Sequence, residues 1–110
     1  MKHNIRVLHI TTGDYVLANV NQIKDGDKLG IVVLYPLKLM ISDYKDDDAT
    51  VSVQYRRWNP FTAYDEYKIN PETVVSMTIP EPGIMKTYLT KLKEGGADMS
   101  FIPNFDELVK

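Results

Sequence analysis

Two successive hairpin patterns near the start of the chain constrain its fold more than any other feature. A β-type apolar run over residues 5–10 reverses at residues 11–14, where Gly13 supplies the positive φ that a tight turn needs. The next apolar run, residues 15–23, reverses at residues 24–27, because an Asp-Gly pair readily adopts the turns that join twisted strands. The sequence therefore predicts consecutive antiparallel strands.

The strand predicted over residues 15–23 alternates between two faces. One face carries Val16, Ala18 and Val20, and the other carries Tyr15, Leu17, Asn19 and Asn21. Such alternation is typical of a strand with one buried face. The small Ala18 at mid-strand permits strong bending of the strand.

Further strands are predicted after the second turn. Residues 28–42 are apolar and β-branched, but Pro36 cannot donate a ladder hydrogen bond, so this segment forms one bent strand or two short ones. Residues 43–48 form a charged loop. The alternating apolar residues that follow predict a strand over residues 50–58, which ends at the Asn-Pro break of residues 59–60.

Two more strands are predicted between residue 61 and Pro80. Residues 61–69 are expected to return antiparallel to the strand over residues 50–58, and residues 73–79 to form a short final strand that ends at Pro80. The expected total is five or six strands. So many strands in so short a chain leave unprotected edges unless the sheet bends and closes, which predicts a mainly β fold with a small barrel.

After Pro82 the period of the apolar residues changes from that of a strand to that of a helix. Apolar side chains recur at helical spacing at Ile84, Met85, Tyr88, Leu89 and Leu92. The Gly-Gly pair at residues 95–96 ends an amphipathic helix of about three turns. In the tail, Asn104 is a candidate helix cap with Glu107 three residues on, and this short segment must dock elsewhere or fray.

Composition narrows the class of protein. The 110 residues are 44% hydrophobic and 25% charged, which predicts one soluble unit: residues 1–80 form the barrel, and residues 81–110 form a helix and tail packed on it or on a neighbouring subunit.

The formal net charge of -2 argues against global attraction to nucleic acid, so a phosphate site must be local. The chain has no cysteine, which excludes disulfides and thiol chemistry. No apolar run approaches the roughly 20 residues of a spanning helix, so we expect no membrane partner and a cytoplasmic location.

Two segments resemble the motifs of the Sm and Sm-like proteins, which include bacterial Hfq. The first, VLHITTGDYVLANVNQI, is similar to the family's apolar strand, glycine turn, and strand with a small residue followed by a valine or leucine. The second, INPETVVSMTIP, is similar to its strand, short turn and closing apolar strand. The segments YPLKLMI, RRWNPFTAYDEYKI, VVSMTIPEP and YLTKL further resemble short Sm-like proteins encoded by tailed phages of marine bacteria. Together these segments cover most of residues 5–92.

The resemblance implies a strongly bent, five-stranded open barrel of SH3-like form, whose edge strands pair between subunits to close a homo-oligomeric ring. It also implies RNA binding and a role in RNA metabolism, in the host cytoplasm for a phage-encoded protein. The chain departs from the family pattern at RNA-binding positions: Lys24 stands where an acidic residue is typical, and residues 70–71 are Asn-Pro where many members have Arg-Gly. The predicted helix follows the last strand, whereas Sm proteins usually carry it before the first.

A basic and aromatic cluster is the candidate RNA-binding site. Its members are Tyr55, Arg56, Arg57, Trp58 and Tyr64, with Phe61 close by in the sequence. Aromatic rings that stack on bases and arginines that contact phosphates are a common way to hold single-stranded RNA. In the alternative interpretation, the aromatic residues fill the core or a subunit interface and the arginines meet acidic loops.

No residue pattern points to catalysis, to a metal or to a cofactor. His3 and His9 lack a carboxylate at ligand spacing, and we expect ordinary surface or strand histidines. The acidic run at residues 46–48 lacks the alternation with glycine of a calcium loop, so a solvated turn is expected. Aspartates in turns make local hydrogen bonds, and this is the expectation for Asp14, Asp25 and Asp27. Phosphate-loop, dinucleotide and nucleophile-elbow motifs are missing from the sequence, and we expect a non-enzymatic protein.

Two functional hypotheses follow from the sequence. In the first, a homo-oligomeric ring binds single-stranded RNA. In the second, the same ring binds another protein, as a phage adaptor or assembly module, and does not bind RNA. An RNA-binding ring loses affinity steeply as the salt concentration rises, whereas an adaptor need show no oligonucleotide binding.

Overall fold

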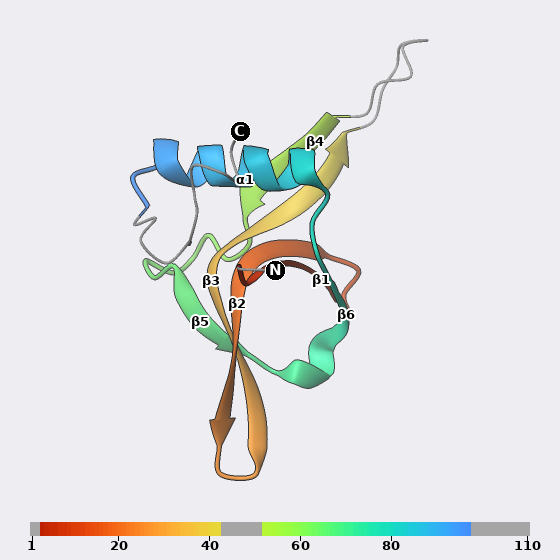
Figure 1. Ribbon diagram of the computed structural model, residues 1–110, viewed down its shortest axis with the longest axis vertical. Helices are drawn as coiled ribbons and strands as arrows, with labels where there is room; N and C mark the ends of the chain where they lie inside the picture. The colour runs from red at the N-terminus through yellow and green to blue at the C-terminus, as the bar shows by residue number, and fades with distance from the viewer. Residues whose placement is uncertain (1–2, 43–51, 98–110) are drawn as a thin grey trace.

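The computed structural model describes residues 3–42 and 52–97 (Figure 1). In this part the chain is mainly β, with an antiparallel sheet of six strands and one α-helix. The strands are β1 (Ile5–Ile10), β2 (Tyr15–Asp25), β3 (Lys28–Ser42), β4 (Ser52–Arg57), β5 (Glu66–Ile69) and β6 (Val74–Thr78). A 3-10 turn (Pro71–Thr73) lies between β5 and β6, and the helix α1 (Pro82–Glu94) follows β6.

The order of the strands in the sheet is β4-β3-β2-β1-β6, and β5 also pairs with β3. Both predicted hairpins are confirmed, and φ is 95° at Gly13 and 66° at Gly26 in their turns. The prediction that residues 61–69 return beside β4 is wrong, because only Glu66–Ile69 forms a strand there and its partner is β3. The predicted mainly β class is confirmed, with strands that follow one another in antiparallel order.

β3 has two partners because it bends sharply near its middle. Tyr35 has a φ of 54°, which residues with side chains rarely adopt, and it directly precedes Pro36. The register between β2 and β3 shifts here, opposite Ala18, so that β3 carries an extra residue in a bulge that bends the strand. Residues 31–34 before the bulge pair with β5, and residues 37–42 after it pair with β4. The segment is therefore one bent strand rather than two short ones.

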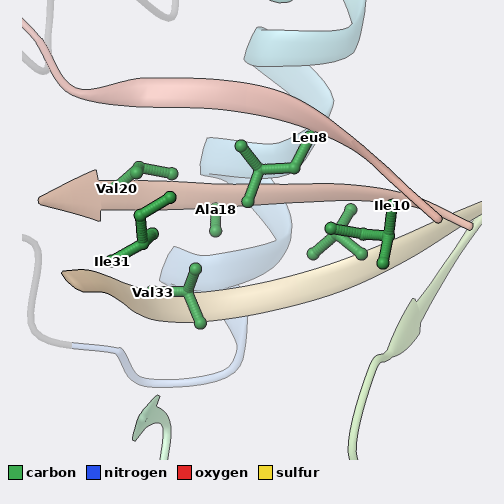
Figure 2. Packing of buried hydrophobic residues seen from close by; sticks show 7 residues of the cluster. Leu8, Ile10, Ala18, Val20, Ile31 and Val33 are labelled. Atoms are coloured by element: carbon green, nitrogen blue, oxygen red, sulfur yellow. The ribbon is translucent and has the colours of Figure 1, made fainter. Parts of the chain in front are cut away.

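One core cluster lies on the face of the sheet away from α1. Its buried members come from the first three strands and are Leu8, Ile10, Val16, Ala18, Val20, Ile31 and Val33. Figure 2 shows these side chains gathered on one side of the strands, with α1 behind them. Trp58, Tyr67 and Met77 are half-buried against the same cluster. The small Ala18 thus lies at the bend and in the core at once.

α1 covers the opposite face of the sheet and forms a second core cluster. The helix contributes Met85, Tyr88, Leu89 and Leu92, at the spacing that predicted an amphipathic helix. Ile5 and Leu17 of the sheet are fully buried beneath it. The prediction of one buried face for β2 is wrong, because Leu17 and Asn19 are also buried. Coverage by a distant helix is a tertiary effect that alternation within a strand does not reveal.

The ends of the helix are both capped. The side chain of Glu81 accepts hydrogen bonds from the backbone N–H groups of Gly83 (3.0 Å) and Ile84 (3.4 Å). At the other end, Gly96 has a φ of 80°, which confirms the predicted Gly-Gly stop. The helix packs on the sheet of its own chain. Within the described residues, no helix has the length and apolar character needed to cross a membrane.

Two of the sequence predictions fall on residues that the structure does not describe. The solvated acidic turn at residues 46–48 lies in one such segment. The candidate cap at Asn104 and its partner Glu107 lie in the other.

His3 is buried next to β1, so it is not a surface histidine. Its Nδ1 accepts a hydrogen bond from the backbone N–H of Ile5 (3.2 Å), and its Nε2 has no partner among the described residues. Burial lowers the pKa of His3, and the positive charges of Arg6 and the N-terminal amine lower it further. The imidazole is therefore held in its neutral form.

We expect mild acid to destabilise the fold through His3. Below the ordinary pKa of 6.5, the unfolded chain takes up a proton that the buried imidazole does not. The stability that His3 contributes is thus complete above pH 6.5 and is lost as the pH falls through that value toward the lower pKa of the folded state. Urea unfolding at steps from about pH 8 to about pH 5 measures this loss.

The variant His3→Gln is the control for this titration, and its unfolding free energy should change less over the same interval. An equal loss in both proteins would contradict the assignment to His3. The carboxyl of Asp14 also has a shifted pKa, but that pKa is lowered from 3.8, so the stability that it contributes is lost only in stronger acid.

Candidate nucleic-acid interface

The structure divides the predicted basic and aromatic cluster between the two faces of the sheet. Tyr55 is half-buried against the α1 core cluster, and the Nζ of Lys91 lies 5.5 Å from the centroid of its ring. Trp58 packs against the other core cluster, with its ring centroid 6.0 Å from that of Tyr67. Tyr55 and Trp58 therefore do not form one stacking surface, and their positions agree with the alternative in which aromatic residues fill the core.

The two arginines of the cluster have different partners. Arg57 is exposed, and its Nη2 lies 3.4 Å from Oδ1 of Asp65 and donates a hydrogen bond to the carbonyl of Tyr64 (3.0 Å). The Nη2 of Arg56 donates to the side-chain oxygen of Gln54 on its own strand (3.3 Å). Neighbouring residues in a strand point to opposite faces, so only Arg57 reaches the loop that carries Tyr64.

The loop between β4 and β5 is locally ordered and presents two aromatic rings. The backbone N–H of Phe61 donates to the side chain of Asn59, and that of Tyr64 donates to the hydroxyl of Thr62, both at 3.1 Å. Phe61 is 96% exposed and Tyr64 is 76% exposed. Two large aromatic side chains in solvent on a braced loop form a surface that can stack on bases or contact a protein.

Phe61, which the sequence placed beside the predicted cluster rather than in it, is the more exposed of the two aromatic residues of this loop. The exposed aromatic surface of this loop consists of Phe61 and Tyr64, with the Arg57 guanidinium alongside. The sequence signal for it is the Asn-Pro break at residues 59–60, because a ring placed directly after such a break sits in a turn rather than in a strand.

A pocket of about 150 Å³ lies beside Arg57, and we call it the Arg57 pocket. Its other lining residues are Tyr35, Pro36, Leu37, Tyr64, Asp65, Tyr67 and Leu92. The hydroxyl of Tyr67 is buried and has no hydrogen-bond partner among the described residues. Burial raises the pKa of Tyr67, an effect that the charge of Arg57 opposes. The pocket is largely apolar, with one ion pair at its rim.

Asp14 links the first turn to Trp58. Its Oδ1 lies 3.2 Å from the Nζ of Lys38. Hydrogen bonding from Lys38 is the main reason why the pKa of Asp14 is lowered, and hydrogen bonds from Thr12 and Trp58 act in the same direction. Thr12 is a local partner, as expected of a turn aspartate, but Lys38 and Trp58 are distant in the sequence, so Asp14 also ties the first turn to other parts of the fold.

The described residues contain no group of three or more metal-binding side chains. The imidazole of His9 instead stacks on Tyr15, with ring centroids 4.5 Å apart and planes 8° apart. This stack borders an apolar pocket of about 250 Å³, whose lining residues are Tyr15, Leu39, Ile41, Val53 and Ile84. We call the surface formed by these residues the apolar patch. Ile41 is 73% exposed there, so the apolar patch offers a second contact surface, on a different part of the molecule from Phe61.

Tyr88 joins the helix to the strained part of β3. Its hydroxyl donates a hydrogen bond to the carbonyl of Tyr35 at 2.8 Å, and the whole side chain is buried. Burial strongly raises the pKa of Tyr88, so the hydroxyl stays protonated and acts as a donor. The backbone N–H of Tyr35 in turn donates to the carbonyl of Asp65 (2.7 Å). The bulge that positions β5 and the Arg57 pocket is therefore held from both sides.

No protein-family model matches the chain, and a search of curated proteins found no match.

Proposed function

We propose that this chain is a non-enzymatic, Sm-like protein that assembles into a ring and binds single-stranded RNA. The observation that carries the proposal is the open edges of the sheet: in the described part of the chain, β5 pairs only with β3 and β6 pairs only with β1, and the added strand β4 likewise pairs only with β3. Unpaired strand edges are templates for pairing with another chain. When β5 of one subunit pairs with β6 of the next, the contact is head-to-tail, and such contacts form a ring where the rotation between subunits closes.

The connection between the two edge strands supports pairing between subunits. Only the 3-10 turn Pro71–Thr73 separates them, and the side chain of Asn70 caps it by accepting from the N–H of Glu72 (3.0 Å). β5 and β6 leave this turn toward different partners in the sheet and do not pair with each other. β6 has no charged side chain, and Val75 is 60% exposed on it. An uncharged edge with an exposed apolar side chain favours association.

The order of the strands in the sheet also supports an Sm-like form of the barrel. β5, β3, β2, β1 and β6 supply five antiparallel strands, each paired with the next, with a strong bend in β3 and a short turn before the last strand of the chain, as the sequence resemblance implies. β4 is then an addition, paired with the C-terminal half of β3 and covered on one face by α1 (Figure 1).

In this proposal, RNA contacts the exposed loop between β4 and β5. Phe61 and Tyr64 supply stacking surfaces, and Arg57 supplies a positive charge next to them. Because the chain has a net charge of -2, attraction to phosphate is confined to such local sites. A ring repeats the loop once in each subunit, so that weak individual contacts act together along one strand of RNA.

Fluorescence anisotropy with labelled oligo-U and oligo-A tests the RNA contact. We expect binding that weakens at least tenfold between about 50 and about 200 mM salt. Stacking on one aromatic ring contributes about 1 to 3 kcal/mol, so the double variant Phe61→Ala/Tyr64→Ala should bind at least about tenfold more weakly than the unchanged protein.

The matched control is Ile41→Ala, which shortens an exposed apolar side chain on the apolar patch, away from the loop. It should leave RNA binding unchanged. Equal losses in the control and in the double variant would contradict the assignment of the loop, and the absence of binding to both oligonucleotides would overturn the RNA function.

The apolar patch favours a second candidate function, that of a protein adaptor or assembly module. Its lining is apolar, and Tyr15 and Ile41 are exposed at 50% and 73%. Exposed apolar patches commonly mark protein interaction sites. A ring that ignores both oligonucleotides would support this function over RNA binding, since an adaptor requires the patch but not the aromatic loop.

A further inference from the structure

The Arg57 pocket continues toward the C-terminal end of α1. A second pocket of about 240 Å³ shares Tyr35, Asp65 and Leu92 with it. The other residues of the second pocket are Lys91, Gly95, Gly96 and Ala97, at the end of the helix. Because they have three lining residues in common, the two pockets are adjacent, and together we call them the tail groove.

The chain leaves α1 directly into this groove. Gly96, with a φ of 80°, reverses the direction of the backbone, and the N–H of Ala97 donates to the carbonyl of Leu92 (3.0 Å). This bond and the left-handed glycine are features of a Schellman cap, which turns the chain back along the helix. Ala97 packs against the α1 core cluster and lines the groove. The described part of the chain therefore ends at one end of the groove.

We propose that residues 98–110 of the same chain dock in the tail groove, with Phe101 or Ile102 in the Arg57 pocket. Phe101 lies four positions after Ala97, and an extended chain spans about 3.3 to 3.6 Å per residue, so the segment reaches about 13 to 14 Å. Because the two pockets share lining residues, a segment of that length that leaves Ala97 in the second pocket extends toward the first. The apolar side chains of the segment are Met99, Phe101, Ile102, Phe105, Leu108 and Val109.

Charge complementarity supports the same occupant. The segment carries Asp98, Asp106, Glu107 and Lys110, which sum to a net charge of -2. Arg57 lines one end of the groove and Lys91 lines the other. Asp65 also lines the groove, but it is paired with Arg57. An acidic and apolar segment thus meets an apolar groove that has the Lys91 ammonium at one end and the Arg57–Asp65 ion pair at the other.

The attachment point favours docking within one chain over exchange with a neighbouring chain. A segment that begins inside the groove has a high effective concentration there, and closing so short a loop costs little entropy. This inference goes beyond the proposed RNA and ring functions and depends on neither, because it concerns contacts within a single subunit.

A cysteine pair tests the docking directly, since the chain has no cysteine of its own. We place one cysteine at Tyr64→Cys, on the exposed rim of the Arg57 pocket, and the other at Ser100→Cys, next to the proposed anchor residues. Mild oxidation should give a disulfide within one chain, seen after denaturation without reductant as a fast-migrating species of monomer mass. The matched control pairs Ser100→Cys with Leu29→Cys, on the β2–β3 hairpin that projects away from α1 (Figure 1).

The outcome of oxidation separates the possible occupants of the groove. Disulfides that form only between chains would assign the groove to the tail of a neighbouring subunit and would overturn the proposal. Cross-linking within the chain that is no faster than in the control would overturn it as well.

A thermal-unfolding comparison gives an independent check. The double variant Phe101→Asp/Ile102→Asp removes both anchors, and we expect its Tm to fall by about 4 to 8 °C. The control Ser100→Asp/Asn104→Asp adds the same two negative charges to the segment and keeps its apolar side chains. Equal Tm values in the two variants would contradict docking through Phe101 or Ile102.

Discussion

We expect that replacing Lys68 with proline converts the proposed ring into monomers. The reason lies in the pairing of β5 with β3, where the N–H of Tyr35 donates to the carbonyl of Asp65. In antiparallel strands, hydrogen-bonded and non-bonded pairs alternate. Counting from Tyr35 and Asp65, the pair of Val32 and Lys68 is non-bonded, so the N–H of Lys68 points away from β3 toward the open edge.

Proline removes that outward donor and leaves the ladder between β3 and β5 in place, as an edge strand tolerates. Size-exclusion chromatography with light scattering measures the change as a drop from the mass of the ring to that of a single chain. Circular dichroism of the same sample should retain the β spectrum of the unchanged protein.

Lys68→Ala is the matched control, because it removes the same charged side chain and keeps the backbone N–H. It should remain assembled. If Lys68→Pro kept the ring mass while it folded normally, pairing through β5 would be excluded, and if both variants became monomeric, the side chain rather than the strand edge would hold the subunits together.

Removing the Tyr88 side chain produces the second large effect. Tyr88 is fully buried between α1 and the sheet, and its hydroxyl holds the carbonyl of Tyr35 at the bulge of β3. We expect Tyr88→Ala to lower the free energy of unfolding by about 3 to 5 kcal/mol, as for other large aromatic residues cut back in a core. That loss is a large fraction of the total stability of a small domain.

Tyr88→Phe separates the hydrogen bond from the packing. It keeps the ring and removes only the hydroxyl, so we expect a loss of about 1 to 2 kcal/mol. Urea unfolding at one fixed protein concentration measures both variants, because the proposed assembly would make stability depend on concentration. Lys86→Ala, on the exposed side of α1, is the control and should change stability by less than about 0.5 kcal/mol. A loss for Tyr88→Phe no greater than that of the control would show that the hydroxyl does not stabilise the bulge.

The turns and the helix could be predicted from the sequence because their signals are local. Gly13 and Gly26 take the positive φ values that their turns require, and Gly96 does the same at the end of α1. The apolar spacing of the helix marks the residues that it buries. Each of these features depends on neighbours within a few positions, so the residue type is enough to reveal it.

The partner of β5 could not be predicted, because it depends on contacts between distant residues. Pro36 signals a bend in β3, but the side chains that stabilise the bulge come from elsewhere: Tyr88 lies 53 positions after Tyr35. That bulge divides β3 into two halves and gives β5 a partner other than β4. No local pattern contains this information.

The candidate RNA-binding cluster shows the same limit. Tyr55 and Trp58 are close in sequence, but they pack on opposite faces of the sheet, against two separate core clusters. Phe61 and Tyr64 remain exposed because the loop that carries them is held by its own side chains, away from both cores. Residue type identified the aromatic residues, whereas the fold decides which of them can meet a ligand.

Native mass spectrometry of the unchanged protein tests ring assembly, the central claim, most directly. Each chain has a mass of 12.6 kDa, and head-to-tail pairing of β5 with β6 predicts one dominant species at a fixed whole-number multiple of that mass, with at least three subunits. A single species at 12.6 kDa, or a ladder of masses without a closed end point, would contradict the ring.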